Sequence, residues 1–197
     1  CYAQVQANIS RFLETEPPGG YYVRGTFTHR NLDFAADVLH LAELGYREIS
    51  LEPVVTTAPG LAITEEDVPI IAEQYELLAQ KVVELHRSGR PINYYHFNIG
   101  TFHAPCLERR IRGCGAGQEY LAITPNGDIY PCHQLVGVAE FWLGNLDTGI
   151  VKPEITKNFA QVNILTKPEC RECWARFYCS GGCYANSHAF SGEISGN

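Results

Sequence analysis

Six cysteines in the second half of the chain constrain its fold more than any other feature. Their spacing is C-x12-G-x4-C followed, after a gap, by C-x2-C-x5-C-x3-C, at Cys114, Cys132, Cys170, Cys173, Cys179 and Cys183. One tetrahedral zinc ion takes only four ligands. Iron–sulfur clusters are usually held by four Cys thiolates each, and a close run of cysteines can serve two clusters at once. The pattern therefore indicates paired iron–sulfur clusters.

The alternative use of the eight cysteines is a disulfide framework, which would allow 105 connectivities. Disulfide scaffolds are usually short and rich in loops, whereas residues 1–100 have the pattern of a domain built from helices and strands. Clustering in the second half, with C-x2-C and C-x3-C spacings, favours metal over disulfides. A zinc-bound structural module stays open, and iron and sulfide content would separate it from iron clusters.

The bulk properties exclude several classes of protein. The 197 residues suffice for one domain of ordinary size or a domain and a half, and 45% of them are hydrophobic. No apolar run is long enough to span a membrane. The net charge of −7 is mild and no basic stripe is present, so we expect no nucleic-acid partner. The chain starts at Cys1 rather than Met, and we expect it to be an internal fragment.

Residues 1–100 alternate between helical and strand patterns. Apolar periodicity predicts helices over 2–14, 31–45 and 64–88, the second capped by Asn31 and the third by Thr64. Aromatic and β-branched runs predict strands over 21–28, 48–55 and 92–97. Strands that alternate with helices imply βαβ units and a parallel sheet. We therefore predict an α/β fold of which these residues form only a part.

The pattern changes after residue 100, where glycines surround the cysteines. Asn126-Gly127 between two apolar runs predicts a hairpin over 118–132, whose turn brings Cys114 and Cys132 to one end. A short helix is predicted near 153–162. Around the last four cysteines, three aromatic residues are expected to keep water from a cluster: Trp174, Phe177 and Tyr178.

Over residues 106–190 this pattern resembles the SPASM extension of radical S-adenosylmethionine (radical SAM) enzymes, matching six of its seven cysteines in order and spacing. The segments 22–28, 50–55 and 130–137 further resemble the maturases of SCIFF peptides, which form Cys-to-α-carbon thioether cross-links. The resemblance implies that residues 1–100 are the C-terminal part of a partial (β/α)6 radical SAM barrel. Residues 101–197 would be the SPASM domain, with its β-hairpin and short helices, truncated before the last cysteine.

The resemblance also implies how the cysteines are used. Cys114, Cys132 and Cys183 would bind a first auxiliary [4Fe–4S] cluster, with Cys106 or a substrate thiolate as the fourth ligand. A second auxiliary cluster would be bound by a downstream cysteine and three residues of this chain: Cys170, Cys173 and Cys179. Cys1 is a lone cysteine on a helix and is expected to be inert.

Three residues of the first half are candidates for the S-adenosylmethionine site. Arg24 resembles a family position near the methionine part of this cofactor, and Arg holds carboxylates well; a strand-end salt bridge is the alternative. Thr26 and Glu52 are predicted to face inward at the C-terminal ends of strands, where barrel active sites lie, or to support that site. His103 and His133 are either cluster neighbours or hydrogen-bonded loop residues.

The family's C-x3-C-x2-C motif is not found in these 197 residues. The full-length protein is therefore expected to bind S-adenosylmethionine and a third [4Fe–4S] cluster, and this portion to be inactive alone. Expected partners are a Cys-rich precursor peptide and a reductant such as ferredoxin or flavodoxin, in the cytoplasm. The alternatives are another SPASM enzyme, which matures a sulfatase or a quinohemoprotein subunit, or a stand-alone iron–sulfur electron carrier. The βαβ segment argues against the carrier, which needs no half barrel.

Overall fold

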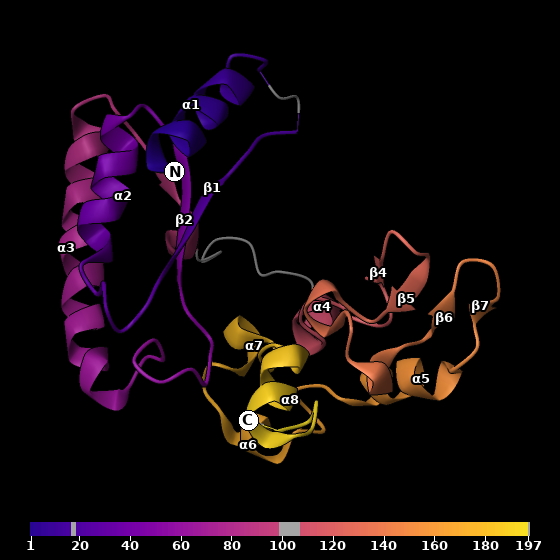
Figure 1. Cartoon of the computed structure of the whole chain (residues 1–197). Helices are drawn as coiled ribbons and strands as arrows, with labels where there is room; N and C mark the ends of the chain where they lie inside the picture. The colour runs from indigo at the N-terminus through magenta and orange to yellow at the C-terminus, as the bar shows by residue number, and fades with distance from the viewer. Residues whose placement is uncertain (17–18, 99–106, 197) are drawn as a thin grey trace. The chain divides into compact units, whose positions relative to one another are not determined.

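The computed structural model describes residues 1–16, 19–98 and 107–196. The chain divides into two compact units, Cys1–Ile99 and Gly100–Asn197. Cys106 and His103 lie outside the described residues. The elements of both units are labelled in Figure 1.

The first unit is built on a parallel sheet of three strands. Its order is β1 (Val23–Phe27), β2 (Glu48–Pro53) and β3 (Asn93–Tyr94), and the register places Thr26 opposite Glu52. Helices α2 (Phe34–Glu43) and α3 (Val68–Arg87) lie side by side on one face of the sheet, and α1 (Tyr2–Leu13) precedes β1 (Figure 1). The predicted βαβ units and their parallel pairing are therefore confirmed.

Aromatic packing between the sheet and the two helices forms the core of this unit. The rings of Phe27 on β1 and Phe34 on α2 are both fully buried and stack with their centroids 4.4 Å apart. Tyr75 on α3 packs edge-on against Phe34, at 4.9 Å. Successive side chains of a strand point to opposite faces of the sheet. Because α2 and α3 cover one face, every second side chain of the strands lies on the other face.

The start of α3 follows the prediction. Thr64 and Asp67 form a capping box: the Thr64 side chain accepts from the backbone N–H of Asp67, and the backbone N–H of Thr64 donates to Asp67 Oδ2 at 2.8 Å. The short 3-10 helix η1 (Glu65–Asp67) leads directly into α3.

Two local predictions in the first unit are wrong. Asn31 does not cap α2, because its Oδ1 accepts hydrogen bonds from the backbone and hydroxyl of Thr28, and the helix begins after Asp33. The third strand ends at Tyr94 and continues as the 3-10 helix η2 (Tyr95–Phe97). Tyr94 and Phe97 pack edge-to-face at 5.0 Å. Residues three apart reach one side through a helical turn, not through an extended strand.

The second unit contains a small antiparallel sheet followed by short helices. Its strands pair in the order β4 (Ala122–Ile123), β5 (Asp128–Tyr130), β6 (Gly144–Asn145) and β7 (Gly149–Ile150). The other elements are α4 (Leu107–Ile111), η3 (His133–Leu135), η4 (Ala139–Phe141), α5 (Pro153–Gln161), α6 (Pro168–Glu172), α7 (Arg176–Cys179) and α8 (Tyr184–Ser191). The predicted hairpin and the helix near 153–162 are both confirmed.

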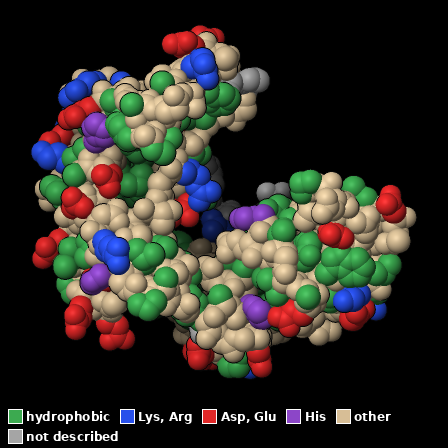
Figure 2. All heavy atoms as spheres, in the orientation of Figure 1, with side chains coloured by type: hydrophobic (Ala, Val, Ile, Leu, Met, Phe, Trp, Pro, Cys, Tyr) green, Lys and Arg blue, Asp and Glu red, His purple; other side chains and the backbone are tan. Residues whose placement is uncertain are grey.

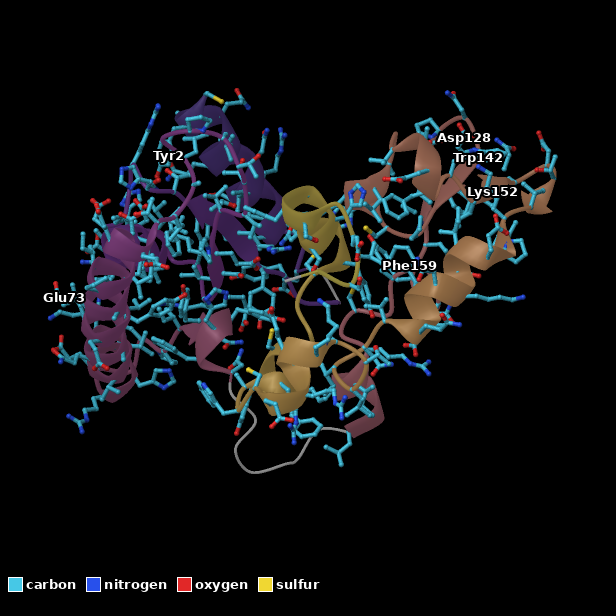
Figure 3. All side chains as sticks on the ribbon, turned by 90° about the horizontal axis from the view of Figure 1, so that it is seen from below. Tyr2, Glu73, Asp128, Trp142, Lys152 and Phe159 are labelled. Carbon is cyan, nitrogen blue, oxygen red and sulfur yellow. The ribbon has the colours of Figure 1, made fainter. Side chains whose placement is uncertain are left out.

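Two sets of side-chain contacts stabilise this unit. The buried rings of Phe141, Phe159 and Tyr184 meet edge-to-face at 5.9 and 5.3 Å. At the hairpin, Trp142 Nε1 donates to Asp128 Oδ1 at 2.9 Å while the Lys152 ammonium lies 5.4 Å from the indole centroid (Figure 3). These contacts tie the antiparallel sheet to the segment that leads into α5.

Lys, Arg, Asp and Glu side chains are interspersed over the face of the molecule shown in Figure 2. In the described part of the chain, no helix combines the length and the apolar composition that crossing a membrane requires.

Candidate functional site

The first group of thiols contains Cys114, Cys132 and Cys183. Burial raises the pKa of the buried Cys132 thiol, the backbone amides of Leu135 and Gln134 lower it, and the charges of Cys183 and Cys114 raise it further. Since the charges of Cys114 and Cys183 both act on Cys132, these two thiols, 69 positions apart in the sequence, both lie near Cys132 in space. Cys132 stands at the N-terminus of η3, so amide donors face its sulfur.

A close approach of two loops explains how Cys114 joins this group. Gly113 has a φ of +62°, and a Cβ built on it would lie 3.3 Å from the carbonyl oxygen of Ser180. The segment before Cys114 therefore passes directly against the turn that precedes Cys183. Only glycine combines this backbone conformation with so little space.

The second group contains Cys170, Cys173 and Cys179. Burial raises the pKa of the Cys170 thiol, the charge of Lys167 lowers it, and Cys179, Cys173 and Glu169 raise it again. Cys170 lies on α6, Cys173 ends that helix, and Cys179 is the last residue of α7. The three thiols line one cavity of about 530 Å³ together with Cys183 of the first group.

The turn between Cys179 and Cys183 links the two groups. Ser180, Gly181 and Gly182 all have left-handed backbone conformations, with φ of 57°, 85° and 76°. Three such residues in succession reverse the chain immediately after α7. Cys179 can therefore face the second group while Cys183 begins α8 and interacts with Cys132 of the first.

All seven cysteines within the described residues are free thiols. In the same part of the chain, no three His, Cys, Asp or Glu side chains converge closely enough to hold one metal ion. The ligands of a [4Fe–4S] cluster lie further apart than those of a single ion, because each thiolate binds its own iron atom and the four thiolate sulfurs surround the whole cluster. Within the described residues each group supplies three cysteine thiols, one fewer than the four that a [4Fe–4S] cluster takes.

The first unit presents a polar site on the face of the sheet opposite α2 and α3. Arg24 Nη2 lies 2.5 Å from Glu52 Oε1, and the hydroxyl of Ser50 donates to the same oxygen at 3.1 Å. Arg24 and Glu52 are partly exposed, and with Ser50 they line a cavity of about 190 Å³ flanked by Tyr22 and Tyr95. The salt-bridge alternative for Arg24 is thus observed, in a place that a ligand can reach.

Thr26 faces solvent on the same strand but does not line the cavity of Arg24 and Glu52. It lines a second cavity of about 260 Å³, together with Tyr2 and Ile9 of α1. The structure therefore brings Arg24 and Glu52 together and places Thr26 beside them at the edge of the sheet.

The sequence analysis missed Ser50 and His96 as members of this site. Burial lowers the pKa of His96, Glu52 raises it and Arg24 lowers it, so the imidazole lies within reach of both charges. Its Nδ1 is 2.7 Å from the hydroxyl of Tyr75. A usable signal was present, because His96 lies near the C-terminal end of the predicted third strand, 92–97, and barrel sites lie at such strand ends.

Of two expectations about the surroundings of the thiols, one is wrong and the other is resolved in favour of one of its alternatives. The predicted aromatic wall is wrong, since Trp174, Phe177 and Tyr178 are 88%, 36% and 64% exposed and none of them lines the cavity. The cavity is lined by Phe190 instead. His133 Nδ1 lies 2.7 Å from the hydroxyl of Tyr120, which is the expected arrangement for a hydrogen-bonded loop histidine.

Comparison with known proteins finds one matching family model and two structures of similar fold. Residues 114–174 match the model of SPASM, an iron-sulfur cluster-binding domain. The structure of hexahistidine-tagged anSMEcpe with bound AdoMet superposes with a TM-score of 0.65 at 14% identity, covering 95% of this chain and 51% of that one. SuiB of Streptococcus suis bound to S-adenosylmethionine gives 0.55 at 16% identity, covering 89% and 43%.

A curated relative, an uncharacterized protein of Archaeoglobus fulgidus, is 32% identical over 154 residues, which are 72% of this chain and 36% of that protein. The chain therefore spans about a third of this relative and about half of each solved structure. Residues 114–174 are thus similar to an iron-sulfur cluster-binding domain, and the chain shares its fold with two proteins that have been solved with S-adenosylmethionine bound.

Proposed function

We propose that this chain is the cluster-bearing portion of a radical SAM enzyme that forms Cys-to-α-carbon thioether cross-links in a ribosomally made, Cys-rich peptide. In this proposal the SPASM unit holds two auxiliary [4Fe–4S] clusters, and the parallel sheet forms part of the barrel that binds S-adenosylmethionine. The full-length protein would hold a third [4Fe–4S] cluster for cleaving that cofactor.

One observation carries the proposal: six cysteines spread over 70 positions meet as two groups of three thiols, joined by the turn of residues 180–182. Grouping brings no electrostatic gain to thiols that bind no metal, because neighbouring thiolates raise one another's pKa and so oppose ionisation. Iron removes this cost, since a metal holds its ligand thiols deprotonated.

The residues present fit the clusters as follows. Cys114, Cys132 and Cys183 supply three ligands of one cluster, and Cys106 is the proposed fourth. Three ligands of the other are Cys170, Cys173 and Cys179. When bound, such clusters supply iron for a substrate thiolate and accept single electrons. The chain itself contributes the amides at the start of η3, which stabilise the charge on Cys132.

The sheet face contributes a binding site for the amino-acid end of S-adenosylmethionine. Arg24 is the proposed partner of the cofactor's carboxylate, because its guanidinium offers a fork of donors. Glu52 holds that guanidinium from the neighbouring strand, and the buried Ser50 hydroxyl fixes the carboxylate of Glu52. Tyr22 and Tyr95 flank the cavity and offer two aromatic rings to a bound ligand.

The class of substrate rests on the resemblance of residues 22–28, 50–55 and 130–137 to maturases of six-cysteine peptides. Thioether formation removes the thiol proton, a hydrogen atom from the α-carbon and one electron, so the peptide product is lighter by two hydrogens per link. The hydrogen atom would leave as part of 5′-deoxyadenosine, and an auxiliary cluster would accept the electron that is released when the C–S bond closes. A reductant such as ferredoxin or flavodoxin would supply the electron that starts each turnover.

The first test is the iron and sulfide content of the full-length protein, reconstituted without oxygen. Cys132→Ala and Cys170→Ala are each expected to lose the iron of one cluster, about four atoms. Cys1→Ala is the matched control, because Cys1 is exposed at the start of α1 and should not change the iron content. Equal iron content in the wild type and in all three variants would refute the cluster assignment.

The second test is the reaction. The reduced full-length protein is incubated with S-adenosylmethionine and a six-cysteine peptide, and the products are followed by mass spectrometry. We expect 5′-deoxyadenosine and peptide lighter by two hydrogens per link. An aldehyde formed from a peptide cysteine or serine would instead identify a sulfatase-maturating enzyme, and no 5′-deoxyadenosine would exclude radical SAM chemistry.

A further inference from the structure

A buried lysine lies next to residues that line the cavity of the second group of thiols. Lys167 is only 2% exposed, although it precedes α6 in a segment whose neighbours Thr166 and Pro168 face solvent. Its Nζ donates to the carbonyl oxygen of Gly181 at 2.9 Å and to the hydroxyl of Ser187 at 3.4 Å. Gly181 and Ser187 both line the 530 Å³ cavity of Cys170, Cys173 and Cys179.

The site is built around this side chain. A Cβ on Gly181 would lie 3.2 Å from Ile164 Cγ2 and 3.9 Å from Lys167 Cδ, so the turn packs directly on the lysine stem. Ser187, from α8, is itself buried. The ammonium is therefore held by the turn on one side and by a helix on the other.

Two neutral acceptors do not account for a buried charge. Removing an ammonium from water costs several kcal/mol, and neutral hydrogen bonds recover only part of this. A neutral donor at this position would serve the same two acceptors equally well. Because its two acceptors, Gly181 and Ser187, both line the cavity of the second group of thiols, the positive charge of Lys167 lies against that cavity.

We propose that Lys167 is the resident counter-charge of the cluster bound at Cys170, Cys173 and Cys179, and that it sets that cluster's reduction potential. This inference rests on the proposed function, because it requires a cluster at this site. A cubane with thiolate ligands carries net negative charge, which increases by one on reduction. A fixed cation beside it favours the reduced form and so raises the potential.

The test uses the reconstituted full-length protein and two substitutions. Lys167→Gln removes the charge but keeps a hydrogen-bond donor, whereas Lys167→Arg keeps the charge. The cluster is reduced stepwise and followed by electron paramagnetic resonance. The double variant Cys170→Ala/Cys173→Ala identifies, by difference, the signal that belongs to this cluster.

We expect Lys167→Gln to lower the reduction equilibrium constant of this cluster at least tenfold, which corresponds to 59 mV for one electron. Lys167→Arg should stay within threefold of the wild type. Glu169→Gln should change the potential in the opposite direction and by less, because Glu169 is an exposed acidic residue that lines the same cavity.

Each outcome decides the inference. If Lys167→Gln loses the cluster and Lys167→Arg keeps it, the charge is needed for binding and the inference stands. If both variants keep an unchanged potential, or both lose the cluster, the charge is not what matters and the inference is refuted. If the double cysteine variant has the same iron content as the wild type, the proposed function itself fails.

Discussion

The loop between Cys114 and the hairpin offers a sharp test of how the second unit is packed. Gly117 has a φ of +74°, and its N–H lies 2.9 Å from the carbonyl oxygen of Tyr120 and 3.0 Å from that of Pro131. A Cβ at this position would lie 3.0 Å from Cγ of Phe159, whose ring is 1% exposed in the core. Figure 3 labels Phe159 on α5. We predict that Gly117→Ala is strongly destabilising.

Two costs add up in this substitution. A non-glycine residue in the left-handed region costs about 1–2 kcal/mol. Forcing a methyl group against a ring that cannot move outward adds about 1–3 kcal/mol, as overpacking of a core does. The free energy of unfolding is therefore expected to fall by about 2–5 kcal/mol in total.

Gly137→Ala is the matched control. Gly137 has a φ of +87°, but no atom lies within 4 Å of the position its Cβ would occupy. This variant carries the conformational cost alone, about 1–2 kcal/mol. Both alanines restrict the unfolded chain equally, so this contribution cancels in the comparison.

The assay is urea unfolding followed by circular dichroism, with all proteins reconstituted to the same iron content. Subtracting the Gly137→Ala effect from the Gly117→Ala effect leaves the packing cost against Phe159, expected at about 1–3 kcal/mol. A difference of zero or of opposite sign would show that Phe159 yields to the methyl group and would refute the reasoning.

Two further predictions concern buried hydrogen bonds. Tyr184→Phe should lower the free energy of unfolding by about 1–3 kcal/mol, because the buried hydroxyl lies 2.9 and 3.1 Å from the carbonyl oxygens of Val162 and Arg112. The exposed control Tyr178→Phe should have no effect in the same urea assay; equal effects would contradict this. Hydrogen bonds from the Thr64 backbone and from His29 hold the pKa of Asp67 below its usual value. Its contribution to stability is therefore present above about pH 4 and lost as the pH falls through the folded-state pKa. The stability gap to Asp67→Asn should narrow in acid, and a gap that does not change with pH would contradict the assignment.

Much of the first unit was predictable from local patterns. Helices α1, α2 and α3 and strands β1 and β2 lie where apolar periodicity and β-branched runs place them. The predicted cap at Thr64 also forms, because its partner Asp67 is only three residues away. Such features depend on neighbours within one or two turns, and these neighbours are visible in the sequence.

Errors arose where a distant contact competed with the local pattern. The aromatic run over 92–97 has strand character, yet packing of Tyr94 and Phe97 on one side turns it into a 3-10 helix after two residues. Trp174 and Tyr178 are adjacent to cysteines in the sequence but face solvent, since they lie on the outer side of the short helical turns. Closeness in sequence did not predict which side chain would face the cavity.

The sequence by itself determined the number and spacing of the cysteine thiols and the alternation of helices and strands that makes a parallel sheet. Tertiary structure alone decided which groups face one another. It placed Glu52 beside Arg24 and buried the Lys167 ammonium beneath the Gly181 turn. The physical reason is the sequence distance over which each property is set. Residue type and periodicity are local properties, whereas the partner of a charged side chain depends on which distant segment the folded chain brings next to it.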